Sequence, residues 1–227
     1  MPIAEIRSLT KVYEQGRLSV RALQNVDLEI EPGEFTVLMG PSGSGKTTLL
    51  NLIGTLDRPT SGKILLEGRD VSGLSKSDRA KLRLTRLGFV FQAYNLLPVL
   101  SAYENAEFVL LLRGVPAVER RARVMKMLKE VGLEGMEDRR PNELSGGQQQ
   151  RVAVARAIVG EPALVLADEP TANLDSKTAK ELISTMRKLN EEHGLTFVFA
   201  THDPEVMARA RRVIRLHDGE IAEDERR

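Results

Sequence analysis

The stretch that most constrains the fold is Gly40-Pro-Ser-Gly-Ser-Gly-Lys-Thr47, because it has the spacing of a phosphate-binding P-loop. The apolar run Phe35–Met39 precedes it, as expected of a strand buried on both faces of a parallel sheet. In residues 46–56 the leucines and isoleucines recur at helical spacing, with Leu49, Leu52, Ile53 and Leu56 on one face. The motif is therefore a strand-to-helix turn, and it predicts an α/β fold built on a parallel sheet.

This loop has the chemistry of an anion site. Its three glycines can bring backbone N–H groups against phosphate oxygens, while the following helix directs its positive end at them. Lys46 is predicted to pair with the β and γ phosphates of a bound ligand, and the Thr47 hydroxyl to hold a bridging Mg²⁺. A Gly-Ser turn that merely happens to precede a helix is the alternative. The predicted binding residues here are Gly40, Pro41, Ser42, Gly43, Ser44, Gly45, Lys46, Thr47 and Thr48.

Composition excludes several classes of function. With 227 residues, 41% of them hydrophobic and 29% charged, the chain is expected to form one globular domain. A net charge of +1 gives no reason to expect a nucleic-acid partner, and the absence of cysteine excludes disulfides and zinc-thiolate sites. The first residues lack a signal-peptide core and no apolar run is long enough for a bilayer, so we expect that the chain does not cross a membrane by itself.

The remaining pattern predicts strands around a helical insertion. Two strands joined by a turn at residues 14–17 are expected within residues 3–30, and the pattern changes to helices from about residue 93 to 161. We therefore expect an α/β core with an N-terminal β subdomain (1–92 and 162–227) and a helical subdomain (93–161). The other predicted strands are Lys63–Leu66, Gly88–Phe91, Ala163–Ala167, Leu195–Thr201 and Val213–Leu216. The predicted helices are Ser77–Leu84, Tyr103–Arg113, Pro116–Val131 and Ser176–His193, and Glu223–Arg227 is expected to be a charged tail.

Four apolar strands end in polar or glycine residues: Gly40, Gln92, the pair Asp168-Glu169, and His202. Ligands of open parallel sheets bind beyond the carboxyl ends of the strands, so these residues should converge on one site. Hydrolysis of a γ-phosphate needs a metal-binding group and a group that orients or deprotonates water. Asp168 is predicted to hold Mg²⁺, Glu169 to act as general base, and His202 to steady the γ-phosphate or the base.

A second glycine-rich helix start occurs at Leu144-Ser-Gly-Gly-Gln148. Ser145 and Gln148 have the spacing of a capping box, so a well-capped helix running to Ile158 would explain them. Two consecutive glycines at a helix start nevertheless cost stability and permit close approach to a bound group. We interpret this segment as a second anion site.

Over essentially its whole length the sequence resembles the ATP-binding subunits of ABC transporters. The family motifs occur in the family's order: Walker A (residues 40–47), Gln92, the LSGGQ signature (144–148), Walker B ending in Asp168-Glu169, Asn173-Leu-Asp175, and His202. Within the family, Gln92–Pro98 and Tyr103-Glu-Asn105 look most like the lipoprotein-releasing and macrolide-exporter branch.

The resemblance implies a P-loop NTPase (RecA-like) fold and an ATPase that energises a membrane transporter of lipoproteins or hydrophobic substrates. It implies that Tyr13 stacks on adenine, that Gln92 contacts the metal and γ-phosphate, and that two copies sandwich two ATP molecules. The residues that would then reach the partner's nucleotide are Ser145, Gly146, Gly147, Gln148 and Asp175. It also implies separately encoded permease subunits and a peripheral position on the inner face of the cell membrane.

Two other classes of function remain open. A transmembrane signalling ATPase of the cell-division kind would share all of these motifs. A soluble ABC-type ATPase of DNA repair or translation is less favoured, because repair enzymes of this type carry a long coiled-coil insertion and translation factors usually carry two such domains. Only 51 residues separate Gln92 from Leu144, without sustained heptads.

Overall fold

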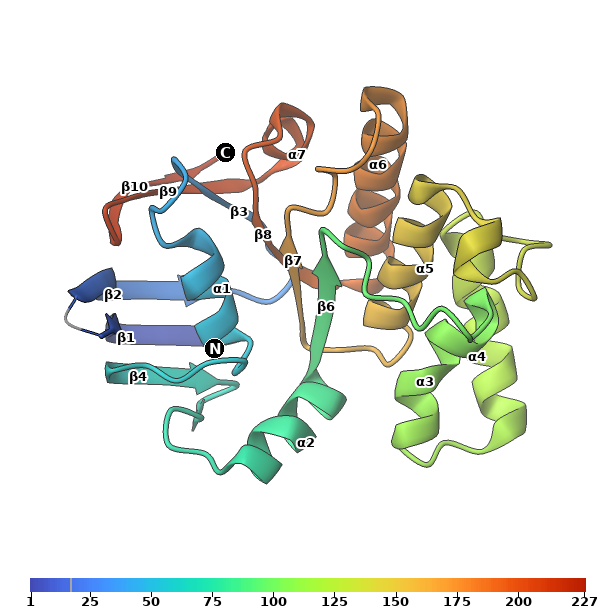
Figure 1. Cartoon of the computed structure of the whole chain (residues 1–227), viewed down its shortest axis with the longest axis horizontal. Helices are drawn as coiled ribbons and strands as arrows, with labels where there is room; N and C mark the ends of the chain where they lie inside the picture. The colour runs from blue at the N-terminus through green and yellow to red at the C-terminus, as the bar shows by residue number, and fades with distance from the viewer. Residues whose placement is uncertain (17) are drawn as a thin grey trace.

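The computed structural model describes residues 1–16 and 18–227 and contains two β-sheets with helices around them (Figure 1). The larger sheet has the strand order β10-β9-β3-β8-β7-β6. Its strands are β3 (Phe35–Met39), β6 (Leu87–Phe91), β7 (Leu164–Asp168), β8 (Thr196–Ala200), β9 (Arg212–His217) and β10 (Glu220–Arg226). The central strands β3, β6, β7 and β8 are parallel, as their continuous apolar sequences predict, and β10 pairs antiparallel with β9.

The smaller sheet is antiparallel and has the order β2-β1-β4-β5. Its strands are β1 (Ala4–Gln15), β2 (Leu18–Ile30), β4 (Ser61–Leu66) and β5 (Arg69–Asp70). From Leu23 to Ile30 the burial of β2 largely alternates, which is typical of a sheet with one face on a core. The predicted strand pair is confirmed. Arg17, part of the predicted turn, lies outside the described residues.

The described residues form seven α-helices: α1 (Lys46–Ile53), α2 (Lys76–Arg86), α3 (Ala102–Leu112), α4 (Ala117–Glu130), α5 (Gly146–Ile158), α6 (Ser176–His193) and α7 (Pro204–Arg209). In Figure 1, α3 and α4 lie at the end of the molecule opposite β1, β2 and β4. The predicted fold class, a parallel core with an N-terminal antiparallel sheet and inserted helices, is therefore confirmed. The division at residues 93 and 161 stays a prediction, and we call residues 93–161 the helical segment.

Two predictions about element ends were wrong. Helix α1 ends at Ile53 rather than Leu56, because Gly54 caps it and Thr55 takes a left-handed conformation with φ of 53°. Leu56, predicted to face inward, is consequently 42% exposed. The predicted charged tail forms most of β10 instead, where Asp224 makes an ion pair of 2.6 Å with the buried Arg212. That pairing holds the chain end against β9.

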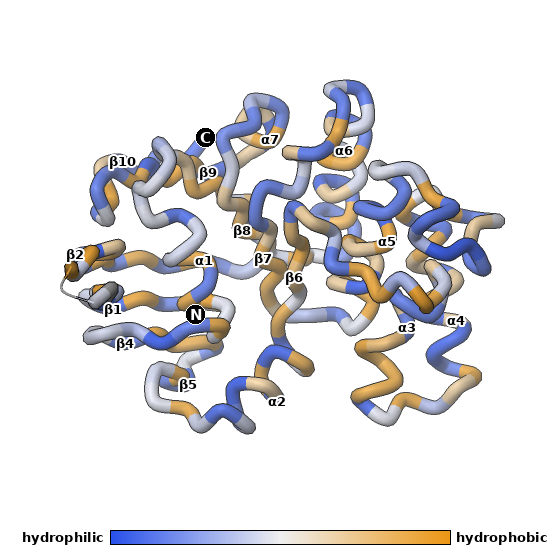
Figure 2. Tube along the Cα trace, viewed as in Figure 1, coloured by the Kyte–Doolittle hydropathy of each residue, from blue (hydrophilic) through white to orange (hydrophobic). Residues whose placement is uncertain are grey.

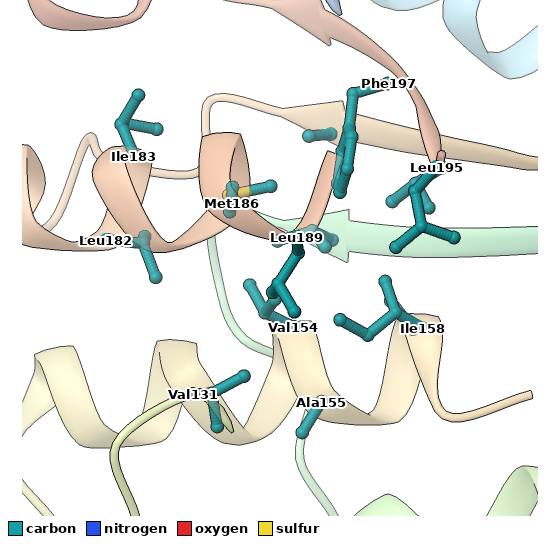
Figure 3. Packing of buried hydrophobic residues seen from close by; sticks show 14 of the residues in the cluster. Val131, Val154, Ala155, Ile158, Leu182, Ile183, Met186, Leu189, Leu195 and Phe197 are labelled. Atoms are coloured by element: carbon teal, nitrogen blue, oxygen red, sulfur yellow. The ribbon is translucent and has the colours of Figure 1, made fainter. Parts of the chain in front are cut away.

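The core is continuous between α5, α6 and the larger sheet. Figure 3 shows Val154 and Ile158 of α5 and Met186 and Leu189 of α6 packed together near Phe197 of β8. In Figure 2 the central strands of this sheet are largely hydrophobic, and so is the C-terminal part of α3. Among residues 1–16 and 18–227, no helix combines the length and the apolar character needed to cross a bilayer.

Candidate functional site

The carboxyl ends of four neighbouring strands lie in one row. Leu38 of β3 pairs with Ala200 of β8, Ala200 with Asp168 of β7, and Asp168 with Phe91 of β6. Asp168, one of the residues predicted to converge, belongs to this row. The others come one or two positions after a member of the row in the sequence: Gly40, Gln92, Glu169 and His202. The register of the sheet therefore puts these chain positions at a single edge.

The glycine-rich loop ends in a helix start that its own side chains do not cap. Gly45, directly before the first residue of α1, has φ of 101°, and a Cβ there would lie 2.6 Å from the Ala22 carbonyl oxygen. The Lys46 ammonium donates to the carbonyl oxygens of Gly40 and Pro41, at 2.7 and 2.9 Å. The buried Ser44 hydroxyl has no hydrogen-bond partner within the described part of the chain. A hydroxyl without a hydrogen-bond partner, an ammonium group and an uncapped helix N-terminus together fit an anionic ligand.

A cavity of about 750 Å³ lies over this loop. The loop residues from Gly40 to Thr48, apart from Ser44, line it, with Tyr13 and Val20 of the smaller sheet and with Glu169 and His202. The volume and the mixture of an aromatic ring with phosphate-binding groups suit a nucleotide. Most of the predicted binding residues are thus brought together, whereas Gln92 and Asp168 are not among the residues that line this cavity.

Tyr13 is held from two sides by residues that sequence reasoning missed. Its hydroxyl donates to Asp57 at 2.9 Å, and the Lys11 ammonium lies 4.6 Å from the ring centroid and 2.8 Å from Asp57. Burial raises the pKa of Tyr13, and the hydrogen bond to Asp57 adds to this effect. Burial would also raise the pKa of Asp57, but hydrogen bonds from Lys11, the Arg58 amide and Tyr13 lower it below its ordinary value. Asp57 therefore stays ionised and keeps the ring in place.

Asp168 and Thr47 form the one predicted metal-binding pair that is in direct contact. The Thr47 hydroxyl donates to Asp168 Oδ1 at 3.1 Å. Burial raises the pKa of Asp168, an effect that its hydrogen bond with Thr47 opposes and the charge of Glu169 reinforces. Two oxygen ligands beside a phosphate-binding loop are the kind of donors that Mg²⁺ prefers.

Glu169 is fixed by two residues that directly follow β8. Its carboxylate accepts from the Thr201 hydroxyl at 2.8 Å and lies 2.9 Å from His202 Nδ1. The backbone at Glu169 has φ of 44°, a left-handed conformation that is uncommon for residues other than glycine. Sequence reasoning paired Glu169 with His202 but missed Thr201, although its place directly after β8 was a usable signal.

Gln92 is exposed at the end of β6. Its carbonyl oxygen accepts from the Asn173 side chain at 3.0 Å, which joins the loop after β6 to the loop before α6. The Gln92 position is thus placed beside Asp168 by the sheet, while a contact of its side chain with metal or phosphate stays a prediction.

The second glycine-rich helix start has its own cavity of about 370 Å³, lined in part by Ser145, Gly147 and Gln148. The predicted capping box is present: the Ser145 hydroxyl accepts from the Gln148 amide, and the Gln148 side chain accepts from the Ser145 amide. Packing within the chain also restricts Gly147, because a Cβ there would lie 2.3 Å from the Thr178 methyl carbon. Close approach of a ligand is therefore not the only reason for this glycine.

Asp175 begins α6 and accepts hydrogen bonds from the backbone amides of Lys177 and Thr178. The Thr178 hydroxyl also donates to it at 2.6 Å and is the main reason that the pKa of Asp175 lies below its ordinary value. Asp175 is exposed, close to the second helix start through Thr178. Its structural function is to cap the helix, and a contact with a partner's nucleotide stays a prediction.

Comparison with known proteins gives consistent matches. Residues 23–172 match the family profile described as "ABC transporter". An uncharacterized ABC transporter ATP-binding protein of Thermotoga maritima is 48% identical over 99% of this chain and 96% of its own length. The macrolide export ATP-binding/permease protein MacB of Marinobacter nauticus is 47% identical over 98% of this chain, which spans only 34% of that protein.

Solved structures match equally well. The ATP-binding cassette MJ0796, in a dimeric post-hydrolysis state bound to ADP and Pi, superposes with a TM-score of 0.90. It is 44% identical, and the match covers 98% of both chains. A chain described as cbiO1 from Clostridium perfringens, part of the ABC transporter complex cbiONQ, has a TM-score of 0.89 and 31% identity, over 99% of this chain and 88% of that one.

Proposed function

This chain belongs to the ABC transporter family of ATP-hydrolysing proteins. From that premise we propose which of its residues bind the nucleotide and which act in its hydrolysis. One observation carries the proposal: Glu169 faces the cavity over the phosphate-binding loop and is oriented there by Thr201 and His202. A carboxylate held in this way can orient and deprotonate an attacking water. Glu169 is the general base, and His202 steadies the γ-phosphate or the base.

The loop residues bind the nucleotide. The uncapped start of α1 receives phosphate oxygens, and Lys46 exchanges its carbonyl partners for the β and γ phosphates. Tyr13 supplies the stacking face for adenine. Thr47, Asp168 and Gln92 are the residues that would hold Mg²⁺, which when bound neutralises charge on the phosphates.

The chain acts as a dimer with a second copy of itself. The known dimer of the MJ0796 cassette supports self-association. The cavity at Ser145 and Gly147 is distinct from the one over the loop, so one chain carries two anion sites that a two-fold arrangement could join. In the assembled ATP sandwich, residues 145–148 and Asp175 of one copy lie against the nucleotide held by the other.

A membrane permease is the partner that uses this energy. The loop after Gln92 exposes Leu97 and Val99, at 42% and 73%, and α3 exposes Leu111 and Leu112. An apolar surface of this kind marks a docking site more often than it marks a packing accident. Relatives of nearly the same length support permease subunits on separate chains. The site would then lie on the inner face of the membrane.

The macrolide-export relatives and the pattern at Gln92–Pro98 support an exporter or extractor of lipoproteins or other hydrophobic substrates. Their names describe both an ATP-binding part and a permease. This chain corresponds to about a third of their length, the part that matches their ATP-binding portion by family.

The Glu169→Gln substitution tests the proposal. It removes the base but keeps the phosphate-binding loop, so ATP affinity should be unchanged while hydrolysis slows by about 10²- to 10⁴-fold. ATP should then hold the variant as a dimer, which size-exclusion chromatography with light scattering detects. Glu192→Gln on the exposed face of α6 is the control. Near-normal turnover by Glu169→Gln would remove Glu169 from this function.

A further inference from the structure

Gln150 links three segments of the site and lies two residues after the last residue of the LSGGQ signature. It lies in the second turn of α5 and is fully buried. Its Nε2 atom donates to the Pro170 carbonyl oxygen at 2.7 Å and lies 3.3 Å from the Phe91 carbonyl oxygen. The amide nitrogen therefore serves two carbonyl groups at once, whereas the buried Oε1 atom has no hydrogen-bond partner within the described part of the chain.

Those two carbonyls belong to residues directly beside the predicted catalytic groups. Phe91 precedes Gln92, and Pro170 follows Glu169. Phe91 and Asp168 are also paired in the register of β6 and β7, so one side chain spans the ends of two adjacent strands. Helix α5 itself begins at the second anion site.

The backbone at Glu169 needs such support. Its φ of 44° is a sparsely populated conformation for a residue with a side chain, and it persists only where the surroundings hold it. The Glu169 amide donates to the Ala200 carbonyl on one side of the turn. Pro170 has no amide hydrogen to donate, so its carbonyl is its only backbone hydrogen-bonding group, and Gln150 engages it.

The three consecutive glutamines have different surroundings. Gln148 completes the capping box at the helix start, and Gln149 donates to the Leu144 carbonyl at 3.1 Å, within the same segment. Gln150 alone of the three reaches the strand ends. Gln149 is therefore a matched control, because it has the same chemistry on the same helix.

We propose that Gln150 is a positioning residue for the general base: its carboxamide fixes the strained turn at Glu169-Pro170 relative to the end of β6 and the start of α5. It touches neither the cavity over the loop nor the reacting atoms, and acts through the backbone of Glu169. The inference rests on the proposed function of Glu169.

The experiment is a double-mutant cycle on the full chain, with Gln150→Met and Glu169→Gln. Methionine has nearly the shape of glutamine but cannot donate a hydrogen bond. Gln150→Met should lower kcat for ATP about tenfold in the unmodified background, because a displaced base loses much of its effect. The KM for ATP should change less than twofold, since the loop and Tyr13 are not touched.

In the Glu169→Gln background the same substitution should change the residual rate less than twofold, measured with excess protein and radiolabelled ATP, because the base it positions is already gone. Gln149→Met should change neither rate. An equal loss in both backgrounds, or a loss expressed only in KM, would overturn the inference and leave the proposed function intact. A Glu169→Gln variant with normal turnover would instead overturn the proposed function.

If Gln150→Met does not fold, as judged by thermal melting, Gln150→Asn enters the same cycle. Asparagine keeps the amide but is one methylene too short to reach both carbonyl groups. Gln150→Asn should therefore also lower kcat only in the background where Glu169 is present. Full activity of a folded Gln150→Asn variant would contradict the inference.

Discussion

Helices α1 and α5 both begin at glycine-rich turns, yet only α5 has side chains that accept hydrogen bonds from the backbone amides of its first turn. At α1, Gly45 caps the helix without any side-chain hydrogen bond. At α5, Ser145 and Gln148 satisfy each other's backbone amides in a complete capping box. A helix start leaves amide groups that need partners, so α1 is built to receive phosphate in each chain.

Because of this difference, two sites of similar chemistry can receive phosphate at different steps. The start of α5 is stable with no ligand present, because its own side chains supply the hydrogen bonds. A phosphate there would have to be brought by another molecule, which agrees with the proposed dimer. The following experiments perturb one helix start at a time.

Lys46→Ala should have the largest effect. It deletes the cation at the α1 site, and ATP affinity should fall by about 100-fold or more because the phosphate charges lose their partner. Equilibrium binding of a fluorescent ATP analogue measures this loss. Lys180→Ala on exposed α6 is the control. Unchanged affinity in Lys46→Ala would mean that this loop is not the nucleotide site.

Ser145→Arg perturbs the α5 site instead. A bulky side chain there should obstruct the partner, so each monomer should bind ATP normally while dimer formation and hydrolysis fall by at least about tenfold. Mixing Ser145→Arg with Glu169→Gln protein tests whether one unmodified Ser145 segment is sufficient for a dimer to form. Ser145→Ala, which removes only the cap, should lower the free energy of unfolding by about 1 kcal/mol. If Ser145→Arg dimerises in ATP as well as the unmodified chain, the capping box is the whole function of this segment.

Asp57→Asn should have a smaller effect at the adenine end of the first cavity. The Tyr13 ring would remain, but its hydroxyl would lose a charged acceptor and Lys11 would lose its ion-pair partner. ATP affinity should fall about threefold, a fraction of the value of one base stacking on an aromatic ring. Affinity for inorganic triphosphate should not change. Asp70→Asn, which contacts Ser72 in another part of the sheet, is the control. An equal loss for both ligands would show that Asp57 does not act through Tyr13.

Much of this arrangement could be predicted because local sequence determines it. The runs before Gly40 and Asp168 are apolar except for Thr36 and lack the alternation of a strand with one face in water, so their burial in a parallel sheet followed directly. Ser145 and Gln148 likewise lie within one helical turn, and the predicted capping box is confirmed.

Contacts between distant segments could not be predicted in this way. Asp57 meets Tyr13 across 44 positions, and Gln150 meets Phe91 across 59, so no local pattern reveals either pair. The end of α1 depends on the conformation of Thr55, and the chain end pairs with β9 through the buried Arg212. Charge at the end of a sequence suggested a solvated tail because its partner lay elsewhere in the fold.

Leu97→Asp combined with Val99→Asp should have the smallest effect on the isolated chain. Val99 is largely exposed and Leu97 is 42% exposed. Asn105 holds the backbone by accepting from the Leu97 amide and donating to its carbonyl, at 2.8 and 3.1 Å. The substitutions should therefore preserve folding, ATP affinity and ATPase activity. Assembly with the proposed permease partner, measured by co-purification and by stimulated ATPase in proteoliposomes, should be lost, because two charges would enter an apolar contact. Val118→Asp on α4 is the matched control, since Val118 is 86% exposed and lies on another helix.

An unfolded double variant would show that these residues belong to the core, whereas normal assembly would move the docking surface to the exposed residues of α3. In the expected outcome both helix starts keep their functions without the permease, which would separate ATP hydrolysis from its coupling to the membrane.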